Sequence, residues 1–449
     1  MAENVVQELP LSGWQQRSWS TAGVPTLVAL PAASPGLNMP VSFPGRQEFL
    51  TTAFGTASDW ARATHLELRL AIPERMPQSA RLAVFARDRD FLWRQVRLPV
   101  TRDAAGQMRL LLPIAGRVAE DTWSGVGHSR PWNALTCALL LEIGCAWELE
   151  TGASESFTGT AELLALRLLQ EEPPPQQQVY DLSFAPRRPF VGGRIEFSFR
   201  LSTWPQQPFS WDSAQISAAI TLPNGQTENI AGFYYEDFLY DASEWDKTRC
   251  LTPAGKPCYK LRYCPRLEGE HSIQISATVD GREIPFAPMT FTAREDVRPW
   301  PGFVRCDPQH KAFLKFDNGA PFWGLGVNVR SPFDNRYQQV APYSNWQDMG
   351  LSAYEHLFRK YRQQGINVVE VWMSSWWLAL EWINDAPGFH GVGHYNQYRA
   401  WMLDYILKLA EENDIYLILA LNNHGKFGMV YDTEWDRNPY NVKCGGFLE

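Results

Sequence analysis

Polar and aromatic side chains follow three predicted buried strands in the last third of the chain. The three runs, 322–330, 365–373 and 416–425, are mainly apolar and stop at amides, a guanidinium, tryptophans or a histidine. Sugar rings present an apolar face with a rim of hydroxyl groups, which suits stacking aromatic rings combined with fixed polar donors. The residue types at the strand ends therefore predict a carbohydrate-binding site, whose candidates are Asn328, Arg330, Trp372, Trp376, Trp377, Asn423 and His424.

Two of these assignments have a structural alternative. A hydrophobic lid that packs on itself would contain the same three tryptophans as a set of stacking platforms. A buried histidine whose hydrogen bonds are satisfied would look the same in sequence as a ligand-binding His424.

Helical patterns separate the three strands. Apolar residues recur at helical spacing in two segments, with stripes formed by Tyr354, Leu357, Phe358 and Tyr361 and by Tyr398, Trp401, Met402, Tyr405, Ile406 and Leu409. The resulting order, strand, helix, strand, helix, strand, is that of a parallel sheet with crossover helices. An open doubly wound sheet has the same local order, but no dinucleotide glycine fingerprint or phosphate loop follows any of these strands. We therefore predict the first part of a (β/α)8 TIM barrel, in which active sites lie at the carboxyl ends of the strands.

A complete barrel of this kind takes roughly 250 residues. Only three strands can be counted between Phe322 and Glu449. We expect the sequence to stop inside the barrel, so that the chemistry on its later strands lies outside this chain.

Two β-rich regions precede the barrel pattern. Residues 1–170 contain short alternating runs at 65–70, 81–85 and 108–112, with a buried run at 138–144, which predicts a jelly roll or sandwich. Residues 171–179, rich in proline and glutamine, predict a linker. Residues 180–293 carry Asn224-Gly225 and Asp280-Gly281 turns and predict an immunoglobulin-like sandwich. A further hairpin is expected around Glu268-Gly269, and residues 294–449 are assigned to the partial barrel. The predicted fold is thus two all-β sandwich domains followed by the first part of a TIM barrel.

Composition narrows the classes of partner. A formal net charge of −8 and the lack of a basic run argue against nucleic acid. The sequence contains no run of eighteen apolar residues, so we predict no membrane-spanning helix. The amino terminus lacks the pattern of a secretory signal, so we expect a cytoplasmic protein, or a secreted or periplasmic one whose leader has been removed.

Seven cysteines form an odd set in which Cys250, Cys258 and Cys264 lie close together. Three states are open for them: a Cys250–Cys258 disulfide in an oxidising compartment, isolated thiols, or a metal site. Their spacing does not match a zinc-knuckle pattern and no histidine lies at ligand spacing. We expect no metal and no organic cofactor.

Three family resemblances accompany these patterns. The segments 88–93 and 127–132 make the first region resemble the galactose-binding-like jelly rolls of carbohydrate-binding modules, although a domain that only braces the barrel is the alternative. The segments 232–234, 259–263 and 268–271 look like the amino-terminal domain that precedes cellulase-like barrels, which implies a supporting role. The phrases at 318–323, 365–369 and 438–441 make residues 180–449 resemble glycoside hydrolases of the cellulase-like (family five-like, clan A) group.

This last resemblance implies retaining hydrolysis of a β-linked polysaccharide or oligosaccharide by two carboxylates, one of which is the nucleophile. It places the acid/base on the fourth strand and the nucleophile on the seventh, so no catalytic residue is assigned within this chain. It also implies that Asn423 and His424 line the central sugar subsite and that Tyr440 and Asn441 lie in a loop over the cleft.

One residue departs from that family pattern. Relatives commonly carry an arginine where this chain has Glu370, and that arginine braces the nucleophile. A glutamate there would tend to raise the pKa of a neighbouring carboxylate. The alternative function is therefore a non-catalytic glycan-binding or scaffold protein. The nearby acidic loop residues Glu381, Asp432 and Glu434 have no spacing that marks them as catalytic.

Overall fold

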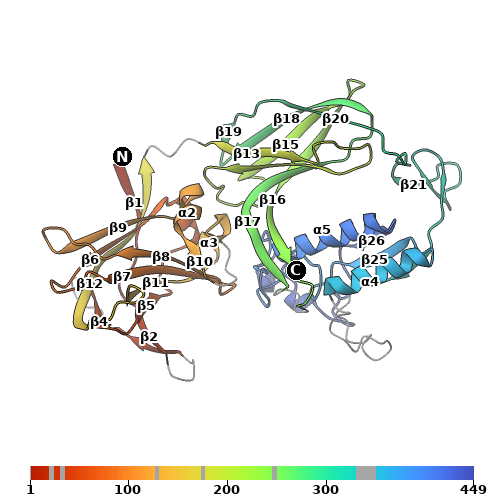
Figure 1. Cartoon of the computed structure of the whole chain (residues 1–449). Coiled ribbons are helices and arrows are strands. Elements are labelled where there is room, and N and C mark those ends of the chain that lie inside the picture. The colour runs from red at the N-terminus through yellow and green to blue at the C-terminus, as the bar shows by residue number, and fades with distance from the viewer. Residues whose placement is uncertain are drawn as a thin grey trace. The chain divides into compact units, whose positions relative to one another are not determined.

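The computed structural model describes residues 2–19, 25–30, 36–126, 131–172, 177–244, 250–329 and 350–449. The chain divides into two compact units, one formed by Met1–Tyr180 with Leu201–Pro208 and the other by Asp181–Arg200 with Phe209–Glu449. Figure 1 shows the elements of both units. Of the predicted linker, Glu171 and Glu172 end a strand, Val179 begins the next one, and residues 173–176 lie outside the described part.

The first unit consists of two antiparallel sheets around one apolar core, as the alternating pattern predicts. The first sheet has the order β1-β12-β6-β9, with β4 paired to β12, and comprises β1 (Ala2–Glu8), β4 (Leu37–Phe43), β6 (His65–Ala71), β9 (Gln107–Pro113) and β12 (Phe157–Glu172). The second has the order β10-β8-β7-β11-β5-β2-β3 and comprises β2 (Gln15–Trp19), β3 (Pro25–Ala29), β5 (Gln47–Thr51), β7 (Ala80–Asp88), β8 (Trp93–Pro99), β10 (Ser124–Gly125) and β11 (Leu140–Leu149). Strict alternation of buried and exposed residues in β4 explains why one face of that strand joins the core.

Three short helices connect these strands: α1 (Ala57–Arg62), α2 (Gly116–Thr122) and α3 (Ala134–Ala138). The predicted strands at 65–70, 81–85 and 108–112 are confirmed. The strand predicted at 138–144 begins only at Leu140, because α3 includes Ala138. Asn133 caps the start of that helix by accepting a hydrogen bond from the backbone N–H of Leu135.

The second unit begins with an antiparallel β-region of the order β13-β14-β17-β16-β15-β18-β19, in which β20 also pairs with β18. Its strands are β13 (Val179–Ala185), β14 (Ile195–Leu201), β15 (Ala214–Thr221), β16 (Thr227–Tyr240), β17 (Leu251–Tyr263), β18 (Gly269–Val279), β19 (Arg282–Ile284) and β20 (Met289–Ala293). Both predicted turns are present. Asp280 and Gly281 have positive φ and form a two-residue hairpin loop, and Gly225 has positive φ in the turn between β15 and β16.

The hairpin predicted around Glu268-Gly269 is wrong. β17 pairs with β14 and β16, whereas β18 pairs with β15, β19 and β20, so residues 264–268 cross between different partners. Alternation located both strands correctly, but it does not say which strands pair. That choice depends on how the apolar faces meet in space.

A small antiparallel sheet leads into the parallel one. It contains β21 (Val304–Cys306), β22 (Leu314–Phe316) and β23 (Pro321–Phe322). The parallel sheet has the order β24-β25-β26, with α4 and α5 between successive strands: β24 (Gly326–Asn328), α4 (Gly350–Gln363), β25 (Val368–Trp372), α5 (Gln397–Glu412) and β26 (Tyr416–Ala420). The predicted alternation of strands and helices is confirmed, although the first predicted strand is divided between β23 and β24.

The helices cover one face of this sheet. Val369 and Val371 of β25 are fully buried in a core that contains Phe358 of α4 and Met402 and Ile406 of α5. The side chain of Asn396 caps α5 by accepting a hydrogen bond from the Arg399 N–H. No helix in the described ranges combines the length and the apolar character that a membrane crossing requires.

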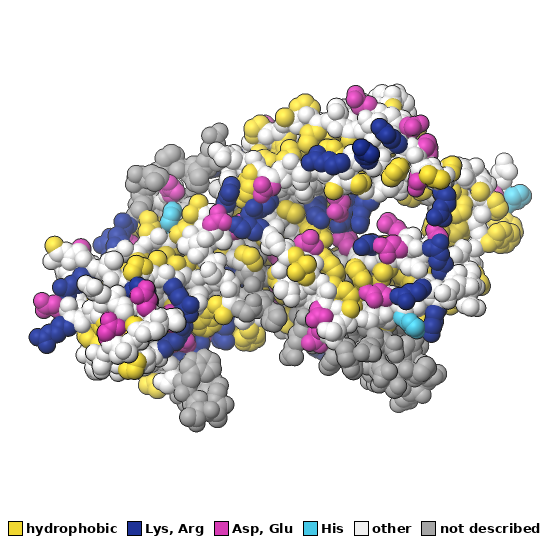
Figure 2. Space-filling model, viewed as in Figure 1, with side chains coloured by type: hydrophobic (Ala, Val, Ile, Leu, Met, Phe, Trp, Pro, Cys, Tyr) yellow, Lys and Arg dark blue, Asp and Glu magenta, His cyan; other side chains and the backbone are white. Residues whose placement is uncertain are grey.

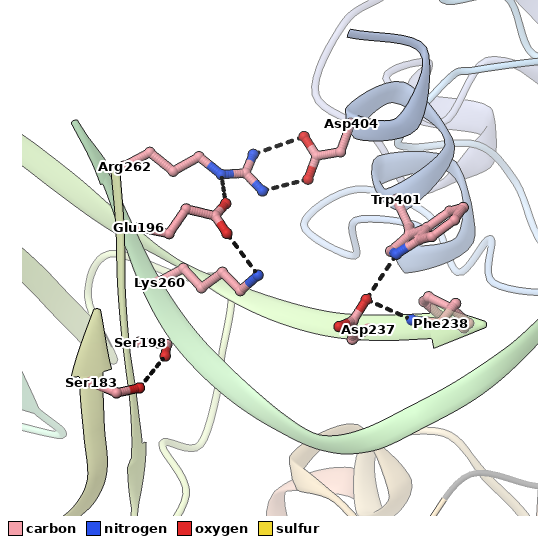
Figure 3. Close-up of polar contacts among 9 residues, drawn as sticks. All are labelled: Ser183, Glu196, Ser198, Asp237, Phe238, Lys260, Arg262, Trp401 and Asp404. Carbon is pink, nitrogen blue, oxygen red and sulfur yellow. Dashed lines mark hydrogen bonds and ion pairs between the residues drawn. The ribbon is translucent and has the colours of Figure 1, made fainter. Parts of the chain in front are cut away.

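The long hairpin of β16 and β17 extends to these helices (Figure 1). Phe238 packs against Tyr398 with ring centroids 4.8 Å apart. Arg262 donates two hydrogen bonds to Asp404 of α5 and one to Glu196 of β14, and Trp401 Nε1 donates to Asp237 Oδ1 at 2.9 Å (Figure 3). The hairpin and the helices thus share one apolar core, framed by these polar contacts.

Across the described part of the chain, no disulfide joins any two of the cysteines. Burial raises the pKa of the Cys258 and Cys264 thiols to about 11, which leaves them protonated at neutral pH.

Candidate functional site

Three residues lie side by side across the parallel strands, on the face of the sheet that the helices do not cover. Asn328 of β24 lies beside Glu370 of β25, and Glu370 lies beside Ile418 of β26. Since side chains alternate between the two faces of a sheet, this row lies opposite Val369 and Val371, which face the helices. The open face is therefore polar at the position where the helix-covered face is apolar.

Glu370 has a direct role in this row. Its Oε1 accepts a hydrogen bond from Trp372 Nε1 at 2.6 Å and a longer one from Asn328 Nδ2 at 3.4 Å. The carboxylate thereby orients the indole at the end of β25. The sequence marked Glu370 only as a replacement for arginine, and its indole partner was missed although it lies two residues away on the same face of the strand.

Trp372 leads from this row to the end of β26. Its ring meets the His424 imidazole edge to face with centroids 5.6 Å apart. His424 Nε2 lies 3.0 Å from Asp432 Oδ2, and both side chains are about half exposed. Three of the predicted site residues therefore form one chain of contacts. Glu370 joins Asn328 to Trp372, the Trp372 ring contacts His424, and His424 pairs with Asp432.

Asn423 lies in a second polar group beside this chain of contacts. Its Nδ2 donates to Glu434 Oε2 at 3.2 Å, and Ser375 Oγ donates to the other oxygen of Glu434. Asn423 is only 4% exposed, yet its Oδ1 accepts no hydrogen bond from any described residue, and the same holds for the fully buried Ser374 Oγ. An unfilled buried acceptor is costly unless a ligand or water supplies a donor.

Lys426 is a site residue that the sequence did not reveal. It is 5% exposed, and its Nζ donates to Met373 O and Leu421 O at 3.2 Å each. These carbonyls follow β25 and β26 by one residue, so the ammonium ties the two strand ends together. Burial lowers the pKa of Lys426, and the carboxylates of Glu434 and Glu381 oppose that shift. The only signal in the sequence was its position two residues after His424.

The predicted loop residues have different roles. Tyr440 O–H donates to Glu381 Oε2 at 2.6 Å, and burial together with this bond raises the pKa of the Tyr440 phenol. Asn441 is buried and accepts from the Lys443 N–H while its Nδ2 donates to Trp435 O. The amide of Asn441 therefore holds its own loop.

The expectation that Trp377 offers a stacking surface is wrong. Its indole is fully buried, stacks on Tyr354 at a centroid distance of 6.0 Å and donates to the Tyr354 hydroxyl at 3.0 Å. The chain turns back into the helical core after Met373, so this residue takes the alternative role of internal packing. Trp376 is partly buried against the same core. Arg330 lies outside the described residues.

A cavity of about 440 Å³ lies elsewhere in the second unit, lined by Glu228, Asn229, Ile230, Arg262, Tyr263, Cys264, Arg266 and Phe303. None of these was a predicted site residue. Arg262 is held by Asp404 and Glu196, and Arg266 lies 3.6 Å from Glu228. Because these charged side chains are already paired within the protein, the cavity has little unpaired charge with which to bind a ligand.

Two further properties concern possible ligands. Among the residues that the structure describes, no group of three or more His, Cys, Asp or Glu is placed to hold a metal ion. On the face drawn in Figure 2, basic and acidic side chains are interspersed rather than gathered into one basic surface.

Comparisons with known proteins gave matches only among solved structures. No protein-family model and no curated protein matches the chain. The chain is similar to a putative glycoside hydrolase from Bacteroides vulgatus ATCC 8482, with 16% identity and a TM-score of 0.35 over 52% of this chain and 41% of that one. It is also similar to a β-1,2-glucanase from Parabacteroides distasonis, with 12% identity and a TM-score of 0.25 over 66% and 38% of the two chains.

A third similar structure is the glycoside hydrolase domain of Endo-D from Streptococcus pneumoniae R6, with 11% identity and a TM-score of 0.16 over 65% and 37% of the chains. This chain thus spans less than half the length of each of the three. Glycoside hydrolases are among the structures it resembles, but at these TM-scores we base its function on the residues of the site.

Proposed function

We propose that the chain binds a β-linked saccharide at the carboxyl ends of β24, β25 and β26. The observation that carries this proposal is the buried Asn423, whose Oδ1 accepts no hydrogen bond within the described chain, beside an indole and an imidazole at the ends of adjacent parallel strands. A sugar hydroxyl supplies the donor that this oxygen needs, and the half-buried Trp372 ring supplies an apolar surface for a sugar face.

We further propose that this site belongs to a cellulase-like glycoside hydrolase with a TIM barrel. Support comes from the parallel strand order and from the position of the polar residues at the strands' carboxyl ends. The family resemblance assigns the reaction to two carboxylates, an acid/base and a nucleophile, and matches neither to a residue of this chain. In this proposal residues 294–449 form part of the barrel, 180–293 a supporting sandwich and 1–170 a carbohydrate-binding-module-like domain.

A non-catalytic glycan-binding protein is the second candidate. It is favoured by Glu370, because this position holds a carboxylate bonded to Trp372 instead of a brace for a nucleophile. Release of reducing sugar by the whole protein encoded by the gene supports the hydrolase. Saccharide binding without any release supports the second candidate.

Calorimetric titration with β-linked gluco-, manno- and xylo-oligosaccharides tests the site itself. We expect Trp372→Ala to weaken binding at least about tenfold, which corresponds to about 1.4 kcal/mol. Trp211→Ala is the matched control, because Trp211 is an exposed tryptophan of the antiparallel β-region. Binding of none of the saccharides, or equal weakening by both substitutions, would contradict the proposal.

A further inference from the structure

Four carboxylates surround the site at the ends of β25 and β26. Each is bonded to a residue of the two polar groups or of the adjoining loop: Glu370 to Trp372, Asp432 to His424, Glu434 to Asn423 and Glu381 to Tyr440. Lys426 lies at the same strand ends, where its Nζ donates to Met373 O and Leu421 O, and the charges of Glu434 and Glu381 act on its ammonium. Four carboxylates against one ammonium leave three negative charges when His424 is neutral.

Charges on the neighbouring described residues do not offset this excess. Arg437 is paired with Asp385, and Lys443 with Asp436, so both cations are balanced within their own loops.

The hydrogen-bonding groups of the site favour the same kind of ligand as its negative charge. Asn423 is 4% exposed and is bonded to Glu434 through Nδ2, so its Oδ1, which accepts no hydrogen bond from the described residues, belongs to an amide within the acidic group. This oxygen can only accept a hydrogen bond. A hydroxyl or an ammonium group satisfies it, whereas an ionised carboxylate or sulfate has no proton to donate.

From these two observations we infer that the site selects saccharides that are neutral or carry amino groups, and discriminates against saccharides that carry carboxylate or sulfate groups. This inference rests on the proposed saccharide-binding function and adds the charge class of the ligand. An aromatic platform accepts any sugar face and does not discriminate by charge. Three excess negative charges, in contrast, repel an anionic sugar at every subsite within about one Debye length, about 10 Å at 0.1 M salt.

A pair of matched ligands tests the inference. β-1,4-linked mannose and mannuronate hexasaccharides share linkage and length and differ in the carboxylate at each ring. We expect calorimetry at about 20 mM salt to show the mannuronate ligand binding at least about tenfold more weakly, and the ratio to shrink at about 500 mM salt because salt screens the repulsion. A glucosamine hexasaccharide should bind at least as tightly as the neutral ligand at low salt.

The outcomes separate the inference from the function on which it rests. Equal binding of mannose and mannuronate ligands, or preference for mannuronate, overturns the inference while saccharide binding stands. Binding of none of the three at either salt concentration overturns the proposed function, and the inference fails with it.

Asp432→Asn provides an independent test within the protein. Asp432 has a φ of 44°, a left-handed conformation that asparagine also tolerates, so the backbone should be preserved. Removing this charge should narrow the mannose-to-mannuronate affinity ratio by about two- to threefold. Glu283→Gln, at an exposed position on β19, is the matched control and should leave the ratio unchanged. An unchanged ratio in Asp432→Asn together with no salt dependence would show that charge does not determine the selectivity.

Discussion

The two faces of the parallel sheet differ although they are built from the same short strands. On one face Val369 and Val371 are fully buried beneath α4 and α5. On the other, Asn328 and Glu370 lie in a row with Ile418, which is 55% exposed. Alternation along each strand therefore gives the two faces different characters: one face stabilises the fold through apolar burial, and the other carries polar groups on its open side.

The largest effect should come from truncating matched isoleucines on the two sides of this comparison. Ile406→Ala removes a fully buried side chain beneath the sheet and should lower the free energy of unfolding by about 2–5 kcal/mol. Ile418→Ala, on the open face, should cost less than about 1 kcal/mol. Urea denaturation followed by near-ultraviolet circular dichroism measures both. Equal losses would mean that the two faces are packed alike.

The polar frame of the helix-covered side should have an intermediate effect. Arg262→Met removes the bonds to Asp404 and Glu196 and leaves both carboxylates without that partner. Since these side chains are about one-fifth to one-quarter exposed, we expect a loss of about 1–2 kcal/mol, below the value for a fully buried pair. Lys408→Met, which breaks an exposed pair with Glu412 on the same helix, should change stability by less than about 0.5 kcal/mol. Similar effects of the two substitutions would contradict the role of Arg262 in joining the hairpin to α5.

The pH dependence of the free energy of unfolding should reveal Lys426, which lies at the strand ends and on neither face of the sheet. The pKa of Lys426 is lower in the folded state than the unfolded value of 10.5. Between these two pKa values the unfolded chain holds more protons, so this residue makes the free energy of unfolding rise as pH increases through the folded pKa toward 10.5. Lys426→Met should remove that rise, whereas Lys443→Met, at an exposed position, should not. Identical pH profiles of wild type and Lys426→Met would show that the ammonium is not desolvated.

Only a small change in stability, below about 1 kcal/mol, is expected for Glu370→Ala on the open face. Its effect should instead be local, because the Trp372 N–H loses its carboxylate acceptor and its nuclear magnetic resonance signal should shift upfield. Trp401 provides an internal control, since its indole N–H donates to Asp237. The Trp401 signal should respond to Asp237→Ala and not to Glu370→Ala. A Trp372 signal that is unchanged in Glu370→Ala would exclude the hydrogen bond.

Local patterns in the sequence predicted much of the fold. Alternation located β6, β9, β14 and β18, and the paired left-handed residues Asp280 and Gly281 identified the β18–β19 hairpin. These features depend on neighbours in the chain. The separation of β17 from β18 could not be predicted in the same way, because strand partners are chosen by long-range packing.

The candidate site shows the same division. Residue type and position at a strand end made Asn328, Trp372, Asn423 and His424 candidates. The structure places them in two adjoining polar groups, and their role in binding stays a prediction. Trp377 was misassigned because its chemistry suits stacking on a ligand or on Tyr354 equally well. Lys426 was missed because a lysine is normally exposed, and only the convergence of two strand-end carbonyls explains its burial.

The β16–β17 hairpin bears on how this protein could have been assembled from exchangeable parts. A break in the gene after residue 293 would separate the antiparallel β-region from the parallel strands at what looks in sequence like a natural boundary. Yet Phe238 and Leu251, on the hairpin, belong to the same core as Tyr398 and Ile406. Replacing the antiparallel β-region by one with a shorter hairpin would expose part of the apolar core of the helices. We therefore expect the two regions to be inherited together, and to be transferable to another protein only as one unit.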